Sequence, residues 1–359
     1  MNKVPKGRGA GSNPAGRFDS TRRAPVGGEV GEGIVEGSAE AEPLPPLATE
    51  VLVDSARSII STNDSPDVPF AQSINPYRGC EHGCVYCYAR QTHAYLGLSP
   101  GLDFETKLFY KADAVALLRE ALGKPGYRCE PISLGANTDP YQPIEKKLRV
   151  TRGILEVLAA AKHPVGIVTK GTLIERDLDL LAAMARERLV HAFVSITTLD
   201  AGLKRRLEPR AASPAARLAT VRALSAAGIP TGVLFAPVIP ALNDHELERV
   251  LEAAAGAGAQ TAGWVLLRLP HEVEGLFREW LERHEPLKAK HVLSLVQQSR
   301  GGRSNDPRFH HRMRGEGAFA ELIAKRFRLA SARLGLDRML PPYDLTRFRA
   351  PSDQLRLEL

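Results

Sequence analysis

The chain has 359 residues, of which 43% are hydrophobic, and carries a formal net charge of +7 with a pI near 9.3. This length and apolar content suit one domain of about 200–250 residues with appendages, and no stretch is apolar enough to span a membrane. With four cysteines and no N-terminal apolar run followed by a cleavage site, the sequence predicts a cytoplasmic protein with reduced thiols.

Residues 1–45 are predicted to be disordered, because glycine, proline and small polar residues leave too little apolar surface to offset the entropy lost on ordering. Residues 46–69 are expected to lead into the folded domain. From about Pro69 onward, short apolar runs alternate with amphipathic helical stretches, which is typical of β/α units and a parallel sheet. The predicted strands are 70–74, 132–136, 165–169, 192–196, 231–235 and 262–267, with an additional strand-like segment at 105–110.

Local signals mark the helices between these strands. Ser213-Pro214 predicts an N-cap followed by proline in the first turn, and Asp244 precedes a helix expected over 246–255. Gly228 and Pro230 are expected to end the helix before the fifth strand. Six successive β/α units therefore follow one another along the chain.

Three cysteines lie directly after the first predicted strand, in the run Gly79-Cys80-Glu81-His82-Gly83-Cys84-Val85-Tyr86-Cys87-Tyr88. Thiolates are the soft ligands of iron–sulfur clusters, and three from one loop leave one iron of a [4Fe–4S] cluster open for chemistry. Zinc is the alternative, with the fourth ligand supplied by Cys129, His82 or His93. A disulfide framework is a further alternative that does not suit reduced thiols.

The cysteine spacing, Tyr86 and the flanking glycines resemble the cluster loop of the radical S-adenosylmethionine (SAM) superfamily. The resemblance implies an α/β fold, a partial TIM-like (βα)6 barrel whose cluster loop follows the first strand. It also implies a [4Fe–4S] cluster on Cys80, Cys84 and Cys87. SAM would bind the open iron and give a 5′-deoxyadenosyl radical after one-electron reduction, which requires a donor such as flavodoxin or ferredoxin.

Polar residues at the strand ends are candidates for SAM binding, since active sites of such barrels lie at the C-terminal ends of the strands. Asn137 and Thr138 follow the second strand and could bind the amino group, or they could form a simple turn before Pro140. Lys170 ends the third strand and could face a carboxylate. Ser195 ends the fourth strand, and Tyr86 is a candidate neighbour of the adenine.

A closer resemblance is to the spore photoproduct lyase-like, or DNA repair photolyase-like, branch of that superfamily. It covers roughly residues 70–300 and rests on the Thr-Lys and Phe-x-Ser strand ends and on further matching segments, which are residues 207–210, 217–218, 227–232 and 236–240. Members carry a cysteine at the end of the second strand that returns a hydrogen atom to the substrate radical. The matching position here is Asn137, which puts that particular reaction in doubt.

Residues 300–359 follow the predicted barrel (70–299) and are rich in basic residues, including Arg300, Arg303, Arg308, Arg312 and Arg314. A basic amphipathic helix is predicted over 319–334. The guanidinium groups suit either nucleic-acid phosphates or salt bridges that seal the open side of the barrel. The favoured function is radical SAM chemistry on a nucleic-acid lesion; the alternatives are modification of a protein or small metabolite, and a non-catalytic iron–sulfur or zinc protein.

Overall fold

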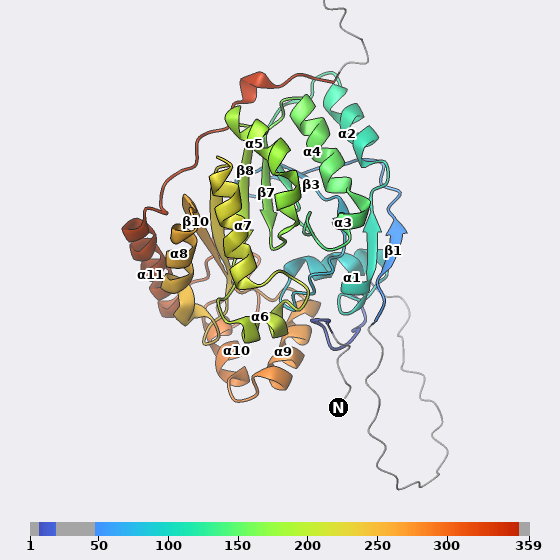
Figure 1. The fold of residues 1–359 in the computed structure, drawn as a ribbon. Helices are drawn as coiled ribbons and strands as arrows, with labels where there is room; N and C mark the ends of the chain where they lie inside the picture. Colours follow the sequence, from blue (N-terminus) through green and yellow to red (C-terminus); the bar gives the residue numbers. More distant parts are fainter. Residues whose placement is uncertain (1–6, 19–46, 352–359) are drawn as a thin grey trace, which may run out of the picture.

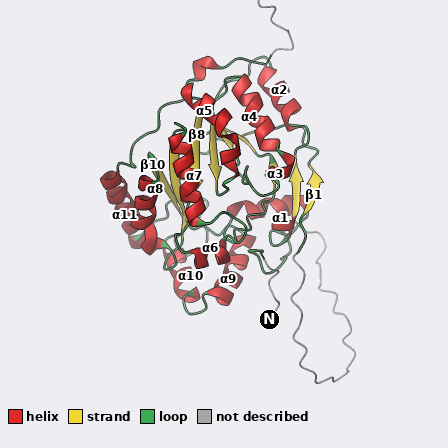
Figure 2. Ribbon diagram, in the orientation of Figure 1, coloured by secondary structure: helices red, strands yellow, loops and turns green. Residues whose placement is uncertain are grey.

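The computed structural model describes residues 7–18 and 47–351, and these form an open α/β barrel (Figures 1 and 2). Six parallel strands make up most of a seven-stranded sheet with the order β10-β9-β8-β7-β6-β3-β2. They are β3 (Gln72–Ile74), β6 (Ile132–Leu134), β7 (Val165–Thr169), β8 (Val190–Ser195), β9 (Thr231–Val238) and β10 (Thr261–Leu266). All six predicted strands are present with shifted ends, which confirms the predicted fold class.

The register of the sheet places one apolar row through its centre. Ile74 pairs with Leu134, Leu134 with Ile167, and Ile167 with Ala192. All four side chains are completely buried. Because both faces of a parallel sheet are covered, these runs are apolar without strict alternation, which is why the sequence pattern identified them.

Helices cover the outside of the sheet (Figure 1). α5 and α7 pack on β8, and α7 and α8 pack on β9. The Ser213 hydroxyl accepts a hydrogen bond from the Ala216 amide at the start of α7, as the N-cap signal predicts. The helices are α2 (Ala114–Gly123), α3 (Glu145–Leu148), α4 (Val150–Ala160), α5 (Leu178–Arg186), α7 (Pro214–Ala226) and α8 (Leu247–Gly256), with 3-10 turns η2 (Leu173–Asp177) and η3 (Asp244–Glu246).

A second, smaller apolar core lies beyond the C-terminal ends of the strands. It is built from α6 (Ala201–Leu207), α9 (Glu272–His284) and α10 (Ala289–Gln298), which lie together below the sheet in Figure 1. Cys84, Val85 and Tyr86 pack into this core beside Leu207 and Phe277. The three-cysteine loop is therefore held between the sheet and a helical layer.

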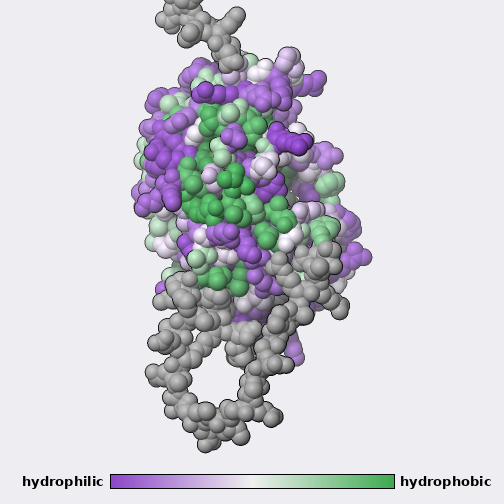
Figure 3. Space-filling view, turned by 90° about the vertical axis from the view of Figure 1, so that its right-hand side faces the viewer, coloured by the Kyte–Doolittle hydropathy of each residue, from purple (hydrophilic) through white to green (hydrophobic). Residues whose placement is uncertain are grey.

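The strand-like segment predicted at 105–110 belongs to a separate three-stranded sheet. The short helix α1 (Asp103–Thr106) leads into β5 (Lys107–Tyr110), which lies between β1 (Glu50–Val53) and β4 (Tyr77–Arg78). The predicted lead-in segment thus supplies β1 here and β2 (Ile60–Thr62) to the main sheet, where β2 runs antiparallel to β3. On this side of the molecule an apolar patch is surrounded by a largely hydrophilic surface (Figure 3).

The prediction of disorder over 1–45 does not hold for residues 7–18. These residues pack on the folded domain, and Arg8, Gly9 and Ala10 are buried. Their backbone and side-chain polar groups find partners in α1 and α9, which composition alone could not indicate. Residues 1–6 and 19–45 of that prediction lie outside the described residues.

The predicted C-terminal helix is α11 (Ala318–Leu334), which packs against α8 and β10. Arg326 and Arg333 form ion pairs with Glu248 and Glu252 of α8. The remaining 3-10 segments are η1 (Tyr88–Leu96) and η4 (Leu345–Arg347). Among the described residues, no helix combines the length and the apolar character needed to cross a bilayer.

Candidate metal centre

The three cysteines lie in a tight loop between β4 and η1, at the C-terminal end of β3. Gly79 and Gly83 both have positive φ, +80° and +68°. A Cβ atom on Gly79 would come within 2.6 Å of Leu108 Cδ2, and one on Gly83 within 2.8 Å of Glu105 Oε2. The loop therefore needs glycine at both positions, because a larger residue fits neither the backbone conformation nor the space.

The three thiols are free and close enough to interact electrostatically. Cys80 and Cys84 are buried and Cys87 is half-buried. Burial raises the pKa of Cys80 well above its usual value, and nearby Asp139, Cys84 and Cys87 raise it further. Burial likewise raises the pKa of Cys84, to about 12, while the neighbouring Lys170 ammonium acts in the opposite direction. Such a thiol is inert unless a metal displaces its proton.

This donor set fits an iron–sulfur cluster better than a single ion. In the described part of the chain, no three His, Cys, Asp or Glu side chains are arranged to hold one metal ion. A four-iron cluster takes each cysteine at a different iron, and so needs thiolates spread around a loop with apolar surroundings, as they are here.

None of the three residues considered as a fourth zinc ligand is placed to complete a site with the three thiols. His82 and His93 contact other groups, and Cys129 lies far from the loop. His82 Nδ1 lies 3.2 Å from Asp139 Oδ2. His93 Nε2 lies 2.9 Å from the Lys107 carbonyl oxygen, and burial lowers the pKa of this imidazole to about 4. Cys129 precedes β6 by three residues and lies at the N-terminal end of the sheet, opposite the loop.

Lys170 and Ser195 meet at the ends of the neighbouring strands β7 and β8. The Lys170 ammonium donates to Ser195 Oγ over 2.9 Å, and Ser195 Oγ donates to the Ala236 carbonyl over 3.2 Å. Parallel strands bring their carboxyl ends to the same edge of the sheet, and here this edge faces Cys84. The structure thus brings together two residues that are 25 positions apart.

Tyr86 points into a buried polar network that the sequence patterns did not identify as functional. Its hydroxyl contacts Thr197 Oγ1 and donates to Glu208, which also accepts a 2.7 Å hydrogen bond from Thr197. Glu208 pairs with the completely buried Arg217, whose Nη1 donates to the Ser195 carbonyl oxygen over 2.9 Å. Both residues belong to segments that carry the closer family resemblance, which was the available signal.

Charge compensation keeps this network ionised. Burial alone would raise the pKa of Glu208, but the Arg217 guanidinium and the Lys170 ammonium outweigh it and hold the pKa at about 2. The Glu208 carboxylate thus links Tyr86 of the cysteine loop to the strand end that carries Ser195. A buried pair of this kind fixes geometry more than it adds stability.

Asn137 and Thr138 follow β6 and lie beside the loop in different roles. Thr138 Oγ1 donates to the Gly79 carbonyl oxygen over 2.7 Å, so this hydroxyl supports the loop. Asn137 is exposed, and its backbone amide donates to Asn75 Oδ1 over 2.7 Å. The expected turn is present one residue later, where Asp139 Oδ1 accepts from the Tyr141 amide.

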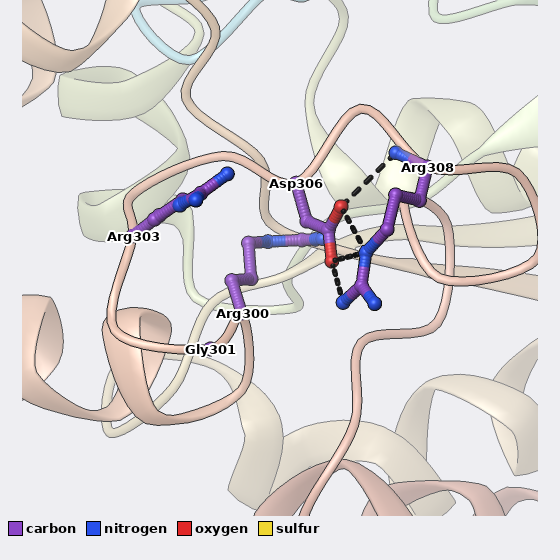
Figure 4. Close-up of a pocket in the computed structure, with 5 residues that line it drawn as sticks. All are labelled: Arg300, Gly301, Arg303, Asp306 and Arg308. Carbon is purple, nitrogen blue, oxygen red and sulfur yellow. Dashed lines mark hydrogen bonds and ion pairs between the residues drawn. The ribbon is translucent and has the colours of Figure 1, made fainter.

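The basic segment after α10 is mostly engaged in intramolecular contacts. Arg300 is buried and donates to the carbonyl oxygens of Leu266, Leu267 and Arg312. Arg308 pairs with Asp306, Arg312 with Asp67, and Arg314 lies over the Trp264 ring. Figure 4 shows a hollow lined by this segment, in which Arg300 points toward the Asp306–Arg308 pair and Arg303 lies to one side. These contacts favour the structural alternative, a seal along β10.

Arg268 is a basic side chain near the loop that the sequence patterns did not single out. Its guanidinium lies 4.7 Å from the centre of the Tyr88 ring, and Tyr88 directly follows Cys87. The Tyr88 hydroxyl in turn donates to the Ala136 carbonyl oxygen. Within the described residues, no carboxylate forms an ion pair with Arg268, and burial lowers the pKa of its guanidinium.

Comparison with known proteins gives matches of three kinds. The family model of the radical SAM superfamily matches residues 74–254. The uncharacterized protein Rv2578c of Mycobacterium tuberculosis is 39% identical over 295 residues, which cover 82% of this chain and 83% of that protein. The uncharacterized protein MJ0683 of Methanocaldococcus jannaschii is 27% identical over 197 residues, 55% of this chain and 71% of that protein.

Solved structures of spore photoproduct lyase share the fold. One, complexed with dinucleoside spore photoproduct, has a TM-score of 0.56 and 17% sequence identity, and the match covers 79% of each chain. Another, a mutant with bound AdoMet and dinucleoside spore photoproduct, has a TM-score of 0.56 and 18% identity, with 79% and 78% covered.

Proposed function

Because this chain belongs to the radical SAM superfamily, we propose that Cys80, Cys84 and Cys87 bind a [4Fe–4S] cluster and that the protein is a radical SAM enzyme. The cluster, when bound and reduced, supplies the electron that cleaves SAM to methionine and a 5′-deoxyadenosyl radical. The observation that carries this proposal is that three free thiols lie in one loop at the C-terminal ends of the strands. The conformation of this loop requires glycine at two positions.

Five side chains around the loop are proposed to form the SAM site, four by contact with SAM and Thr138 by supporting the loop. The Lys170 ammonium and the Ser195 hydroxyl, 2.9 Å apart, can bind the carboxylate or ribose oxygens. Asn137 is exposed beside the loop and can accept from the amino group, while Thr138 holds the Gly79 carbonyl in place. Tyr86, fixed by Glu208 and Thr197, presents its ring as a neighbour of the adenine.

The substrate is proposed to be a nucleic-acid lesion or a nucleic-acid-associated molecule. Arg268 supports this proposal, because its guanidinium lies over the Tyr88 ring and forms no ion pair with a carboxylate of residues 7–18 or 47–351. Such a group suits an anionic substrate such as a phosphodiester. The net charge of +7 acts in the same direction by attracting polyanions. Modification of a protein or small metabolite is the alternative, and an electron donor such as flavodoxin or ferredoxin is required in either case.

The cofactor proposal is tested by anaerobic purification and a single-turnover assay. The protein should contain roughly four irons per chain and, with dithionite, convert SAM to 5′-deoxyadenosine and methionine. Replacing Cys80, Cys84 or Cys87 with Ala should remove most of the iron, whereas the matched change Cys129→Ala should not. Stoichiometric zinc without iron, or iron without SAM cleavage, would instead support the non-catalytic alternatives.

The substrate proposal needs a separate measurement. Untargeted comparison of nucleic acids and metabolites from cells with and without the gene should show the accumulating substrate. Arg268→Gln should weaken oligonucleotide binding and reduce its salt dependence by about one unit of logarithmic slope, while Arg328→Gln on the exposed face of α11 should not. If the comparison of cells with and without the gene shows differences only in peptides or metabolites, the enzyme modifies a protein or small metabolite instead.

A further inference from the structure

The N-terminal segment 7–18, called the strap here, contacts the back of the cysteine loop. The backbone amides of Gly9 and Ala10 donate to the two oxygens of the Glu105 carboxylate, over 2.9 Å and 2.8 Å. Glu105 is completely buried, so these two amides supply hydrogen bonds that water cannot provide. The strap is thus part of the environment of a buried charge.

Glu105 transmits this contact to the loop through Arg90. The Arg90 guanidinium is also completely buried and pairs with Glu105 through Nη2. Its Nε donates to the carbonyl oxygen of Cys84 over 2.8 Å. The chain of contacts therefore runs from Ala10 through a buried ion pair to the backbone of a proposed iron ligand.

A second chain of contacts reaches the residue after Cys80. Arg8 donates through Nη1 to the Glu105 carbonyl oxygen over 2.7 Å and through Nη2 to Thr49 Oγ1 over 3.0 Å. Thr49 Oγ1 donates to Glu81 Oε1 over 2.7 Å. The strap is therefore connected to both halves of the loop, on either side of Gly83.

The strap also approaches the loop directly. A Cβ atom on Gly9 would overlap the carbonyl oxygen of Gly83. Only glycine allows this approach, since both backbones occupy the space that a side chain would need. Adding a single methyl group at position 9 should therefore push the strap away from the loop.

The rest of the strap is anchored away from the loop, between α1 and α9 (Figure 1). Ser12 Oγ donates to Glu279 Oε2 over 2.6 Å, and Asn13 donates to Asp103 Oδ1 over 3.1 Å. At its far end Arg17 pairs with Glu272 over 2.9 Å. The bonds of Ser12 and Asn13 hold Gly9 and Ala10 against Glu105. The Arg17 pair is exposed at the far end, so its loss should leave Gly9 and Ala10 in place.

We propose that the strap is a structural part of the metal centre, in which Gly9 and Ala10 act as positioning residues for the cysteine loop. This proposal rests on the proposed cluster at Cys80, Cys84 and Cys87. A loop that is held by a fully paired buried network keeps its thiols in one arrangement. The loop therefore loses less conformational entropy when it binds the cluster, and the bound cluster is released more slowly. Without the strap, the Arg90–Glu105 pair is opened to water and the loop loses its rear support.

The test compares Gly9→Val, and a deletion of residues 2–18, with the matched control Arg17→Ala. After identical anaerobic reconstitution we expect both strap variants to retain less than about half of the wild-type iron. We also expect their visible absorption to bleach in air about tenfold faster, the factor that corresponds to ~1.4 kcal/mol. The control should stay within about twofold of wild type.

A readout that does not use the cluster keeps the outcomes distinct. In the iron-free protein, the thiols of Cys80 and Cys84 should react with a disulfide reagent faster in both strap variants than in wild type or Arg17→Ala. Unchanged iron content, bleaching and thiol reactivity in the deletion variant would overturn the role of the strap, even if Gly9→Val proves unstable. Wild-type protein that binds no iron would instead overturn the proposed function.

Discussion

Glu208 shows at the scale of one residue how burial and charge are balanced at this site. The carboxylate is completely buried, yet Arg217 and Lys170 keep it ionised, with a pKa held at about 2. In the unfolded chain a glutamate titrates near pH 4.3. Relative to its protonated form, ionised Glu208 therefore stabilises the folded state by an amount that is fully present above about pH 4.5 and is lost as the pH falls towards 2.

A prediction follows for the pH dependence of unfolding. For Glu208 the shift corresponds to roughly 3 kcal/mol, because each pKa unit is worth about 1.4 kcal/mol. Glu208→Gln should lower the free energy of unfolding at pH 7 and flatten its decline between pH 4.5 and 2, measured by urea titration. The exposed pair of Glu252 offers a control, and Glu252→Gln should change neither quantity by more than a few tenths of a kcal/mol.

Lys170 and Ser195 allow a second prediction at this scale. If each makes a charge-assisted hydrogen bond to SAM, Lys170→Ala or Ser195→Ala should cost about 1.5–3 kcal/mol of binding, which is roughly a tenfold or larger rise in the SAM concentration at half-saturation. Equilibrium binding to the reconstituted protein measures it. Lys162→Ala, which removes a half-exposed surface pair with Glu187, should leave SAM binding unchanged. Equal affinity in all three variants would refute the assigned roles of Lys170 and Ser195 but not the cluster.

Among the elements, the segment between α10 and α11 illustrates how basic residues can serve the fold. Arg312 pairs with Asp67, whose side chain is 3% exposed, and donates to Ser65, so the segment is tied to the lead-in residues before β3. Arg300 is fully engaged with carbonyl oxygens of the β10 end. These contacts cover the open edge of the sheet, which a partial barrel would otherwise expose.

The element-level prediction separates a sealing role from phosphate binding. Arg312→Glu removes the ion pair of Asp67 and places a second carboxylate near it, leaving the hydrogen bond from the His310 amide. This change should lower the free energy of unfolding by roughly 1–3 kcal/mol. Thermal melting measures the effect, with Arg328→Glu on α11 as the control of equal charge change. Should Arg312→Glu melt like wild type while losing nucleic-acid binding, the segment would be a phosphate-binding element instead.

Over the whole molecule, a fold shared with spore photoproduct lyase does not by itself imply that enzyme's reaction. The family resemblance implies that Asn137 occupies the position of the hydrogen-donating cysteine, and an amide N–H bond is too strong to donate a hydrogen atom readily. Cys129 lies at the opposite end of the sheet, so it cannot replace the thiol. Tyr141 is a side chain near this position that could in principle donate a hydrogen atom, but it is buried and its hydroxyl donates to Asp177 over 3.1 Å.

We therefore expect inefficient repair of spore photoproduct. Incubating the reconstituted enzyme with SAM, dithionite and dinucleoside spore photoproduct should give little thymidylyl-thymidine over many turnovers. Asn137→Cys is the informative variant, because it restores a thiol at the matching position and should increase product if the substrate binds at all. Clean multiple-turnover repair by the wild type, unaffected by Cys129→Ala, would show that Asn137 was misinterpreted.

The sequence by itself determined the order of strands and helices and the position of the cysteine loop. The signals used were local: the periodicity of apolar residues, the Ser213 cap and the spacing of Cys80, Cys84 and Cys87. Local signals can be recognised in a sequence without knowledge of the tertiary structure. They also place Lys170 and Ser195 at strand ends, although not in contact. These local signals predicted the six parallel strands with shifted ends, whereas the partial barrel was implied by the family resemblance and β1, β2 and β4 were not predicted.

The tertiary structure alone decided which partners the charged groups find. Glu208 meets Arg217, Arg312 meets Asp67, and the Gly9 amide meets Glu105 across 96 positions of the chain. Composition favoured disorder for the N-terminal residues because their apolar content is low. Residues 7–18 are held instead by hydrogen bonds between their polar groups and residues that are far away in the chain. Pairing and desolvation depend on distances between remote segments, and a sequence pattern contains no such distances.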